Sequence, residues 1–199
     1  KLGANLEEIK FDFDLNDFEQ PFHKCLMHTF SFCVNEQFYN VDPKKLMPHV
    51  KNTIERGKKV MASDYAKALA QLSEYRFKMD NIFSKFDYIV SPTVAIPPHK
   101  CNERPNIING KIDISTIDDK EMFEENDYDY SSWIFVLAQF TAPFNWSGNP
   151  AVSLPCGFTK SGLPIGLQLA GKKRGELSLI QASKAFEEIK PWQQNRPSI

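Results

Sequence analysis

The sequence predicts an α/β fold in which a partial mixed β-sheet is covered by helices. Three observations support this: short apolar runs of strand length, longer segments with apolar residues at helical spacing, and turn residues between them. Two of the runs, residues 151–158 and 163–169, flank the turn Lys160–Ser161–Gly162 and form an expected hairpin. Because both runs are apolar at successive positions, we expect helices on both faces of this sheet.

Composition excludes several classes of protein. The 199 residues suffice for one sizeable domain, and contents of 42% hydrophobic and 25% charged residues are ordinary for a globular protein. A net charge of −1 argues against a charge-driven nucleic-acid surface. No apolar run approaches the roughly 20 residues that span a bilayer. We therefore expect a cytoplasmic protein that binds neither nucleic acid nor membrane.

The cysteines show no disulfide framework and are interpreted as free thiols of a reducing compartment. They are scattered along the chain, at Cys25, Cys33, Cys101 and Cys156. Only the segment with His23, Cys25, His28 and Cys33 resembles a metal site. On a helix only Cys25 and His28 share a face, and zinc sites more usually contain Cys-x-x-Cys or His-x-x-x-His pairs. We expect ordinary helix residues and no metal.

The first third of the chain predicts a strand followed by helices. Residues 7–13 alternate charged and apolar side chains, which indicates a half-buried strand with Ile9, Phe11 and Phe13 facing the core. Residues 18–38 carry apolar residues at helical spacing. A further helix begins at the N-cap Asp42 and ends at the C-cap Gly57.

A long helix capped by Ser63 then extends to about residue 83, and a strand at 86–91 stops at Pro92. Arg76 on that helix has two readings: contact with an anionic substrate group, or a solvent-facing or paired arginine. The second is favoured. Residues 94–130 form a long surface loop or lid insertion, with a small hairpin expected at 107–112.

Two helices complete the prediction. Residues 130–144 form an aromatic helix, which ends before the breaker-rich stretch 145–150. Residues 176–190 show helical spacing and end at Pro191.

The chain also resembles a known family. The matching motifs are Phe86 to Thr93, Pro143-Phe144-Asn145, Gly148-x-Pro150-Ala151, Ser153-x-Pro155-x-Gly157 and Gly162 to Gln168. In this order and spacing they resemble the C-terminal half of the amidase signature family. The resemblance covers nearly all of residues 1–199, as the C-terminal part of one such domain.

The resemblance implies an amidase, which hydrolyses carbon–nitrogen bonds through an acyl-enzyme without a metal or organic cofactor. Family members use a Ser, cis-Ser, Lys triad in a Gly/Ser-rich segment of the first half. This chain has only nine glycines and no Gly-Gly or Gly-Ser-Ser run, so no catalytic residue is assigned to it. By resemblance it supplies scaffold and pocket walls, with candidate substrate-pocket residues Trp133, Phe140, Thr141, Phe144 and Asn145.

The branch of the family that uses glutamine to amidate mischarged tRNA has an acidic residue five positions before the motif proline. That position is Ala138 here. We therefore expect a general amidase for small apolar or aryl amides. The expected partner is the N-terminal half of the same domain, because a sheet cut between strands exposes an edge that invites pairing or self-association. The alternatives are a non-catalytic binding or regulatory half-domain, or a fragment without activity of its own.

Overall fold

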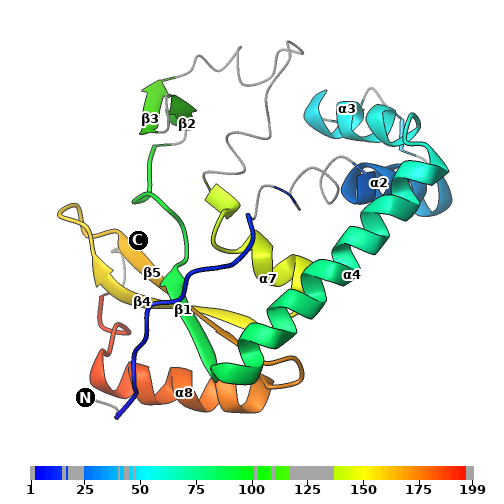
Figure 1. The fold of residues 1–199 in the computed structure, drawn as a ribbon. Coiled ribbons are helices and arrows are strands. Elements are labelled where there is room, and N and C mark those ends of the chain that lie inside the picture. The colour runs from blue at the N-terminus through cyan, green and yellow to red at the C-terminus, as the bar shows by residue number, and fades with distance from the viewer. Residues whose placement is uncertain are drawn as a thin grey trace.

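The computed structural model describes residues 3–14, 17, 25–39, 41–42, 45–46, 48–100, 103–108, 111–116 and 137–195. Its centre is a three-stranded sheet in the order β1-β5-β4, formed by β1 (Tyr88–Pro92), β4 (Ala151–Phe158) and β5 (Pro164–Gly171). Figure 1 shows this sheet between the long helix α4 (Ala62–Lys85) and the C-terminal helix α8 (Glu176–Ile189). Within the described residues, no helix combines the length and apolar character needed to cross a membrane.

Strand β5 pairs antiparallel with both of its neighbours, so its register determines the sheet. The pairs with β1 run from Tyr88↔Gly171 to Pro92↔Leu167. Those with β4 start at Ala151↔Ala170 and shift at a bulge between Pro155 and Gly157. The predicted hairpin and α/β class are confirmed. The three described strands of this sheet form only antiparallel pairs, so the parallel pairs of a mixed sheet are not among them.

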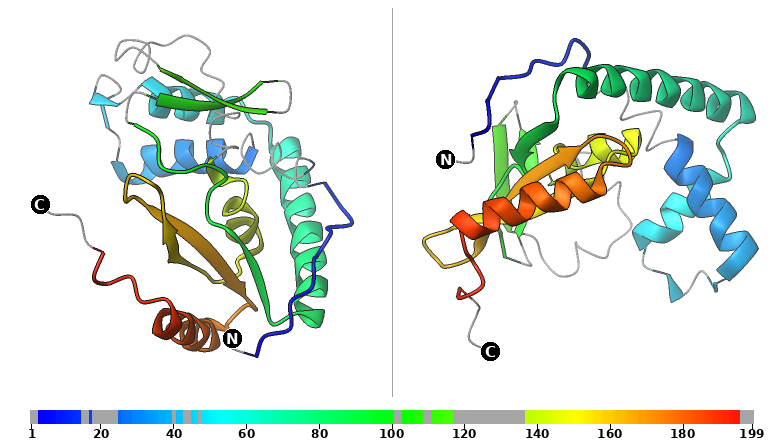
Figure 2. Two further views of the ribbon diagram at one scale, coloured as in Figure 1. Left: turned by 90° about the vertical axis from the view of Figure 1, so that its left-hand side faces the viewer. Right: turned by 90° about the horizontal axis from the view of Figure 1, so that it is seen from below.

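Helices cover both faces of the sheet, as the apolar runs predicted. On one face, called here the α4 face, Ile89 and Ala170 join the buried core with residues from α4 and the short helix α7 (Ala142–Ser147). On the other, the α8 face, the buried Leu179 of α8 lies against Gly171. Figure 2 shows α8 and α4 on opposite sides of the strands.

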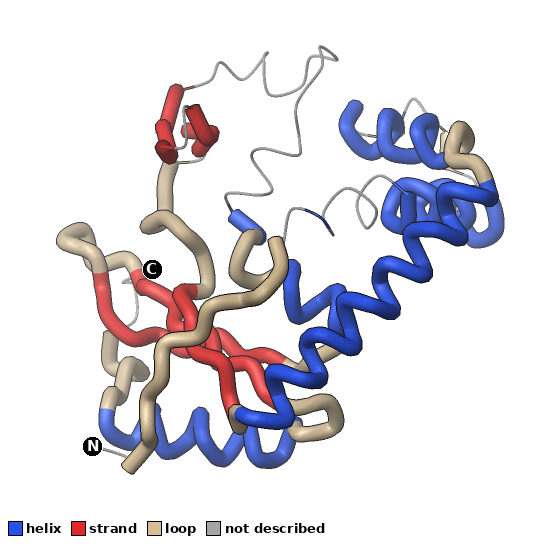
Figure 3. The backbone as a smooth tube through the Cα atoms, viewed as in Figure 1, coloured by secondary structure: helices blue, strands red, loops and turns tan. Residues whose placement is uncertain are grey.

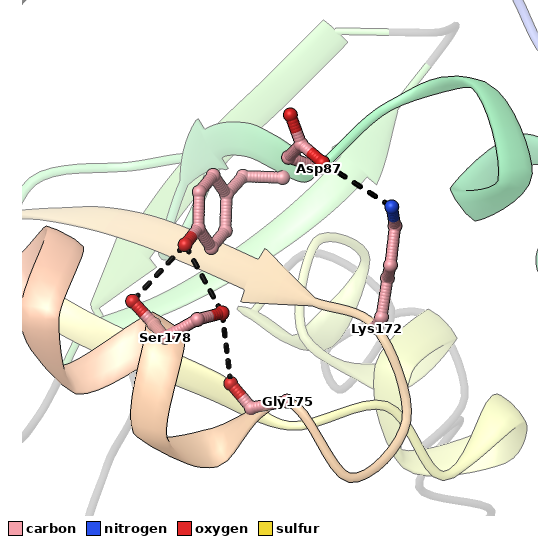
Figure 4. A network of polar contacts seen from close by, with 5 residues as sticks. Asp87, Lys172, Gly175 and Ser178 are labelled. Carbon is pink, nitrogen blue, oxygen red and sulfur yellow. Dashed lines mark hydrogen bonds and ion pairs between the residues drawn. The ribbon is translucent and has the colours of Figure 1, made fainter.

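The turn between β5 and α8 is attached to the start of β1. The Tyr88 hydroxyl contacts the backbone carbonyl and the hydroxyl of Ser178 at 3.0 and 3.1 Å. Lys172 forms an ion pair with Asp87 at 3.2 Å (Figure 4). Both ion-pair side chains are largely exposed, so this pair contributes little to stability. The tyrosine contacts hold the first turn of α8 against the start of β1.

Helices α2 (His28–Val34) and α3 (Pro48–Gly57) pack together beside the N-terminal part of α4, away from the sheet (Figures 1 and 3). The π-helical segment Asn35–Tyr39 follows α2 directly. Helix α3 ends at Gly57 as predicted, but Gly57 is its last helical residue rather than a cap beyond it, and its φ is not positive. A Cβ at Gly57 would overlap the carbonyl of His28 and the side chain of Phe32, so glycine is required by close helix packing.

A second, two-stranded sheet lies beyond the end of β1. It contains β2 (Glu103–Ile108) and β3 (Lys111–Thr116), which pair antiparallel from Glu103↔Thr116 to Ile108↔Lys111. The hairpin expected at 107–112 is therefore present and extends further than predicted. Residues 117–130 of the expected insertion lie outside the described residues.

Three sequence-based expectations were wrong in detail. Residues 7–13 form no strand, although Ile9, Phe11 and Phe13 pack partly buried against the core as expected. The alternation of charged and apolar residues over 7–13 therefore indicates which side chains pack against the core, and not that the backbone pairs with another strand. Helix α4 begins after Met61, without a side-chain cap from Ser63. The helix expected over 130–144 is interrupted at residues 139–141, and α7 follows the interruption.

Replacing Gly57 tests the close packing of α3 on α2. Gly57→Ala places a methyl group against the His28 carbonyl, so we expect a loss of about 1–3 kcal/mol in unfolding free energy. Gly157→Ala is the matched control, because nothing lies within 4 Å of a Cβ there. Chemical denaturation of both variants gives the comparison. Equal stability of the two would contradict the packing assigned to Gly57.

Candidate functional site

Helix α7 carries the motif Pro143-Phe144-Asn145 and is held against α4 by a buried tyrosine. Tyr75 has no exposed surface, and its hydroxyl donates to the Pro143 carbonyl at 3.1 Å. Its ring meets Trp146 at a centroid distance of 5.8 Å and Phe13 at 5.7 Å, both edge-on. One side chain thus joins α4, α7 and the N-terminal segment by apolar packing, while its single polar group is satisfied.

Arg76, the next residue of α4, caps the other end of α7. Its Nε donates to the Trp146 carbonyl at 3.1 Å, and Gly148 ends the helix at φ 77°. A helix leaves its last carbonyls without intrahelical partners, and a cation near them is favourable. Of the two readings of Arg76, the paired arginine agrees with this contact.

The α4 face becomes polar where the core ends. Ser91 and Ser153 are the direct cross-strand partners of Gln168 on either side, and we call these three residues the polar rung. Gln168 is 3% exposed, and its Nε2 donates to Ser91 Oγ at 3.0 Å and to the Phe140 carbonyl at 2.6 Å. The polar rung therefore binds the segment that precedes α7.

The next position along the strands is occupied by two hydroxyl groups above a glycine. Thr93 Oγ1 and Ser153 Oγ lie 2.6 Å apart, and the Thr93 amide donates to the Gly166 carbonyl at 3.0 Å. A Cβ at Gly166 would lie 2.6 Å from Thr93 Oγ1 and 2.8 Å from Ser153 Oγ. Glycine at 166 is thus what allows the two hydroxyls to meet across β5.

The described pocket candidates fall into two groups. Phe140 and Thr141 belong to residues 138–141, called here the pocket turn, where the Thr141 amide and hydroxyl contact the Ala138 carbonyl at 2.9 and 3.3 Å. Phe144 is buried in the core and Asn145 is exposed, both on α7. Trp133 lies outside the described residues. The assignment of these five residues to a substrate pocket stays a prediction.

Sequence reasoning did not single out the members of the polar rung or Thr93. Each stands inside a recognised motif, but the motif gives no strand register. The sequence does contain one indication: each of three apolar runs has a polar residue within it, at positions 91, 153 and 168. When the strands pair, these three residues become cross-strand neighbours.

Metal-binding geometry is not found within the described part of the chain, where no three His, Cys, Asp or Glu residues lie close enough to hold an ion. Cys25 is half-buried and Cys33 is exposed, and both are free thiols. Burial is the main cause that raises the pKa of the Cys25 thiol, followed by the charge of Asp64. His23 lies outside the described residues.

Comparison with known proteins agrees with this fold and these motifs. The family model described as Amidase matches residues 21–180. A glutamyl-tRNA(Gln) amidotransferase subunit from Thermodesulfovibrio yellowstonii is 33% identical over 135 residues, which are 68% of this chain and 23% of that protein. The chain belongs to the amidase signature family.

Solved structures show the same fold at lower identity. A 6-aminohexanoate cyclic dimer hydrolase superposes with a TM-score of 0.71 at 22% identity, covering 91% of this chain and 36% of that one. A bacterial aryl acylamidase of the amidase signature family gives 0.66 at 22% identity, covering 99% and 38%. The chain thus spans about a quarter to two fifths of the length of these proteins.

Tyr75→Phe tests the docking of α7 on α4. The ring keeps its packing while the Pro143 carbonyl loses its buried donor, so we expect a loss of about 1–2 kcal/mol in unfolding free energy near neutral pH. Tyr88→Phe is the matched control, because its hydroxyl bonds are exposed and their loss costs less. Urea denaturation of the two variants provides the measurement.

The difference between wild type and Tyr75→Phe also depends on pH. Burial strongly raises the pKa of Tyr75 above its ordinary value of 10.0, so the folded state keeps the proton that the unfolded state releases. The contribution of the hydroxyl is complete below pH 10 and declines above it. The stability gap should therefore narrow as the pH rises beyond 10. A constant gap to pH 11 would contradict burial of this hydroxyl.

Proposed function

We propose that this chain is the scaffold and pocket-forming part of an amidase that hydrolyses amide bonds through an acyl-enzyme. The observation that carries the proposal is family membership over residues 21–180. The chain spans only part of its relatives, and the Ser and Lys residues of the family chemistry have no counterpart in its motifs. In the proposal, catalysis therefore requires residues that this chain does not contain.

The proposed chemistry is acyl transfer to a serine. A neutral lysine activates the nucleophilic serine through a second serine, backbone N–H groups hold the oxyanion, and water releases the acid. The part of this chain is to present the pocket turn and α7 at a fixed position beside that centre. The contacts of Gln168 with Phe140 and of Tyr75 with Pro143 support such a role.

The proposed substrates are small apolar or aryl amides, because Ala138 lacks the acid that the glutamine-using branch has at this position. Glutamine is the second candidate substrate. It is favoured by the curated relatives, which include a glutamyl-tRNA(Gln) amidotransferase subunit from Moorella thermoacetica at 30% identity over 169 residues. Ammonia release by the complete protein from glutamine, compared with release from an aryl amide, distinguishes the two.

Truncating Trp133 or Phe140, the aromatic residues of the proposed pocket wall, should change the substrate profile of the complete protein. Trp133→Ala and Phe140→Ala each remove apolar surface from the proposed pocket, at a cost of about 1–3 kcal/mol in binding an aryl group. We expect kcat/KM to fall about tenfold or more for aryl amides relative to acetamide. Phe77→Ala, at an exposed phenylalanine of α4, is the control. If the ratio of kcat/KM for aryl amides to that for acetamide is unchanged in both Trp133→Ala and Phe140→Ala, the two residues do not line the pocket.

The proposed partner is the remaining half of the same domain, either covalently attached or associated. Among the described strands, β1 and β4 each pair on one side only, and Val90 of β1 is 49% exposed. An open strand edge with apolar residues favours pairing with another strand. The rival interpretation is a binding or regulatory half-domain, and it predicts a stable monomer.

A lysine on the open edge should prevent self-association of the isolated chain. Val90→Lys places a charge on β1, and we expect it to shift the chain from dimers or larger species toward monomer in light scattering. Leu69→Lys, on the exposed side of α4, is the control and should leave association unchanged. A wild-type chain that is monomeric at all concentrations would instead support the binding-module interpretation.

A further inference from the structure

The pocket turn lies where the backbone changes from one helix to the next. Residues 137–138 are helical, residues 139–141 are a turn, and α7 begins at Ala142. The first backbone hydrogen bonds of α7 reach the Thr141 carbonyl, from Phe144 at 3.2 Å and Asn145 at 3.4 Å. The Phe140 carbonyl instead points to the sheet and accepts from Gln168.

Gln168 is suited to hold this carbonyl because it occupies the central strand and is almost fully buried. Its amide group has two N–H donors, and these contact Ser91 Oγ and the Phe140 carbonyl. Ser91, on the neighbouring strand β1, accepts the other N–H of this amide. A partly buried carbonyl is less stable without a donor, so the 2.6 Å contact favours one position of the pocket turn.

We propose that Gln168 is a positioning residue that fixes the pocket turn against the sheet and thereby sets which acyl groups the pocket accepts. The first part rests on the contacts of Gln168. The second rests on the proposed function, in which Phe140 forms a wall of the pocket. Gln168 touches no reacting atom in this scheme, and acts through the backbone of Phe140.

Hydrogen exchange tests the positioning role without any catalysis. Gln168→Met has nearly the same shape but no donor, so the amides of Phe144 and Asn145 should exchange about tenfold faster than in wild type. The Leu179 amide, which bonds the Gly175 carbonyl at 3.0 Å in α8, is the internal reference and should keep its rate. Unchanged rates at 144 and 145, or an equal increase at 179, would overturn the proposal.

Two control variants separate the carbonyl contact from general damage. Ser91→Ala removes the other acceptor of Gln168 and should leave exchange at 144 and 145 within about threefold of wild type. Gln181→Met makes the same substitution at an exposed position of α8 and should have no effect. A Ser91→Ala effect as large as that of Gln168→Met would show that the Phe140 contact is not decisive, and would overturn the proposal.

Gln168→Glu keeps the test decisive if the methionine variant fails to fold. An ionised carboxylate cannot donate to the Phe140 carbonyl, whereas a protonated one can. Burial favours the neutral acid, so lowering the pH should restore slow exchange at 144 and 145 relative to wild type at each pH. Exchange that stays equally fast at every pH, or equals wild type throughout, would contradict a donor requirement at this position.

The effect on specificity is measured in the complete protein. For Gln168→Met, the ratio of kcat/KM between a bulky and a small acyl amide should change about tenfold, mainly through KM, since the wall moves and the catalytic residues do not. Faster exchange with an unchanged ratio would confirm the positioning role and overturn its link to specificity. A wild-type protein inactive on every amide would refute the proposed function itself, while leaving the exchange result intact.

Discussion

The hydroxyl group of Tyr75 and the ring that carries it hold the structure together around α7. The side chain is completely buried, and it joins α4, α7 and the N-terminal segment in one aromatic cluster. A phenylalanine would pack equally well, but it would leave the Pro143 carbonyl without its donor. Because Arg76 then caps the end of the same helix, two consecutive residues of α4 determine both the position and the end of α7.

The α4 face of the sheet is apolar at one end of its strands and polar at the other. Ile89 and Ala170 contribute to the apolar core, and one alternation step further Ser91 and Gln168 replace them. The sheet therefore changes from packing against helix side chains to binding the backbone of the pocket turn. Gly166 continues this change by leaving room for the hydroxyls of Thr93 and Ser153. The proposed pocket wall is thus attached to the central strand of the sheet.

Local sequence patterns were enough to predict the elements that are determined by residues close to one another in sequence. The β4–β5 hairpin, α4 and α8 were predicted with small boundary errors, because period and turn chemistry determine them. Residues 7–13 show the limit: alternation predicted which side chains are buried but not whether the backbone pairs. The contact of Gln168 with the Phe140 carbonyl and the close approach of Gly57 to His28 join residues that are distant in sequence, so no local pattern predicts them. The same holds for the polar rung, which exists only once three strands are in register.

In the proposed function, this chain shapes the pocket of an amidase and supplies no catalytic residue. The most direct test is to treat the complete protein with a serine-reactive fluorophosphonate and locate the adduct by peptide mass spectrometry. We expect a single modified serine outside residues 1–199, with labelling blocked by an amide substrate. An adduct on Ser91, Ser153 or any other serine of this chain, equally blocked by substrate, would contradict the proposed division of roles.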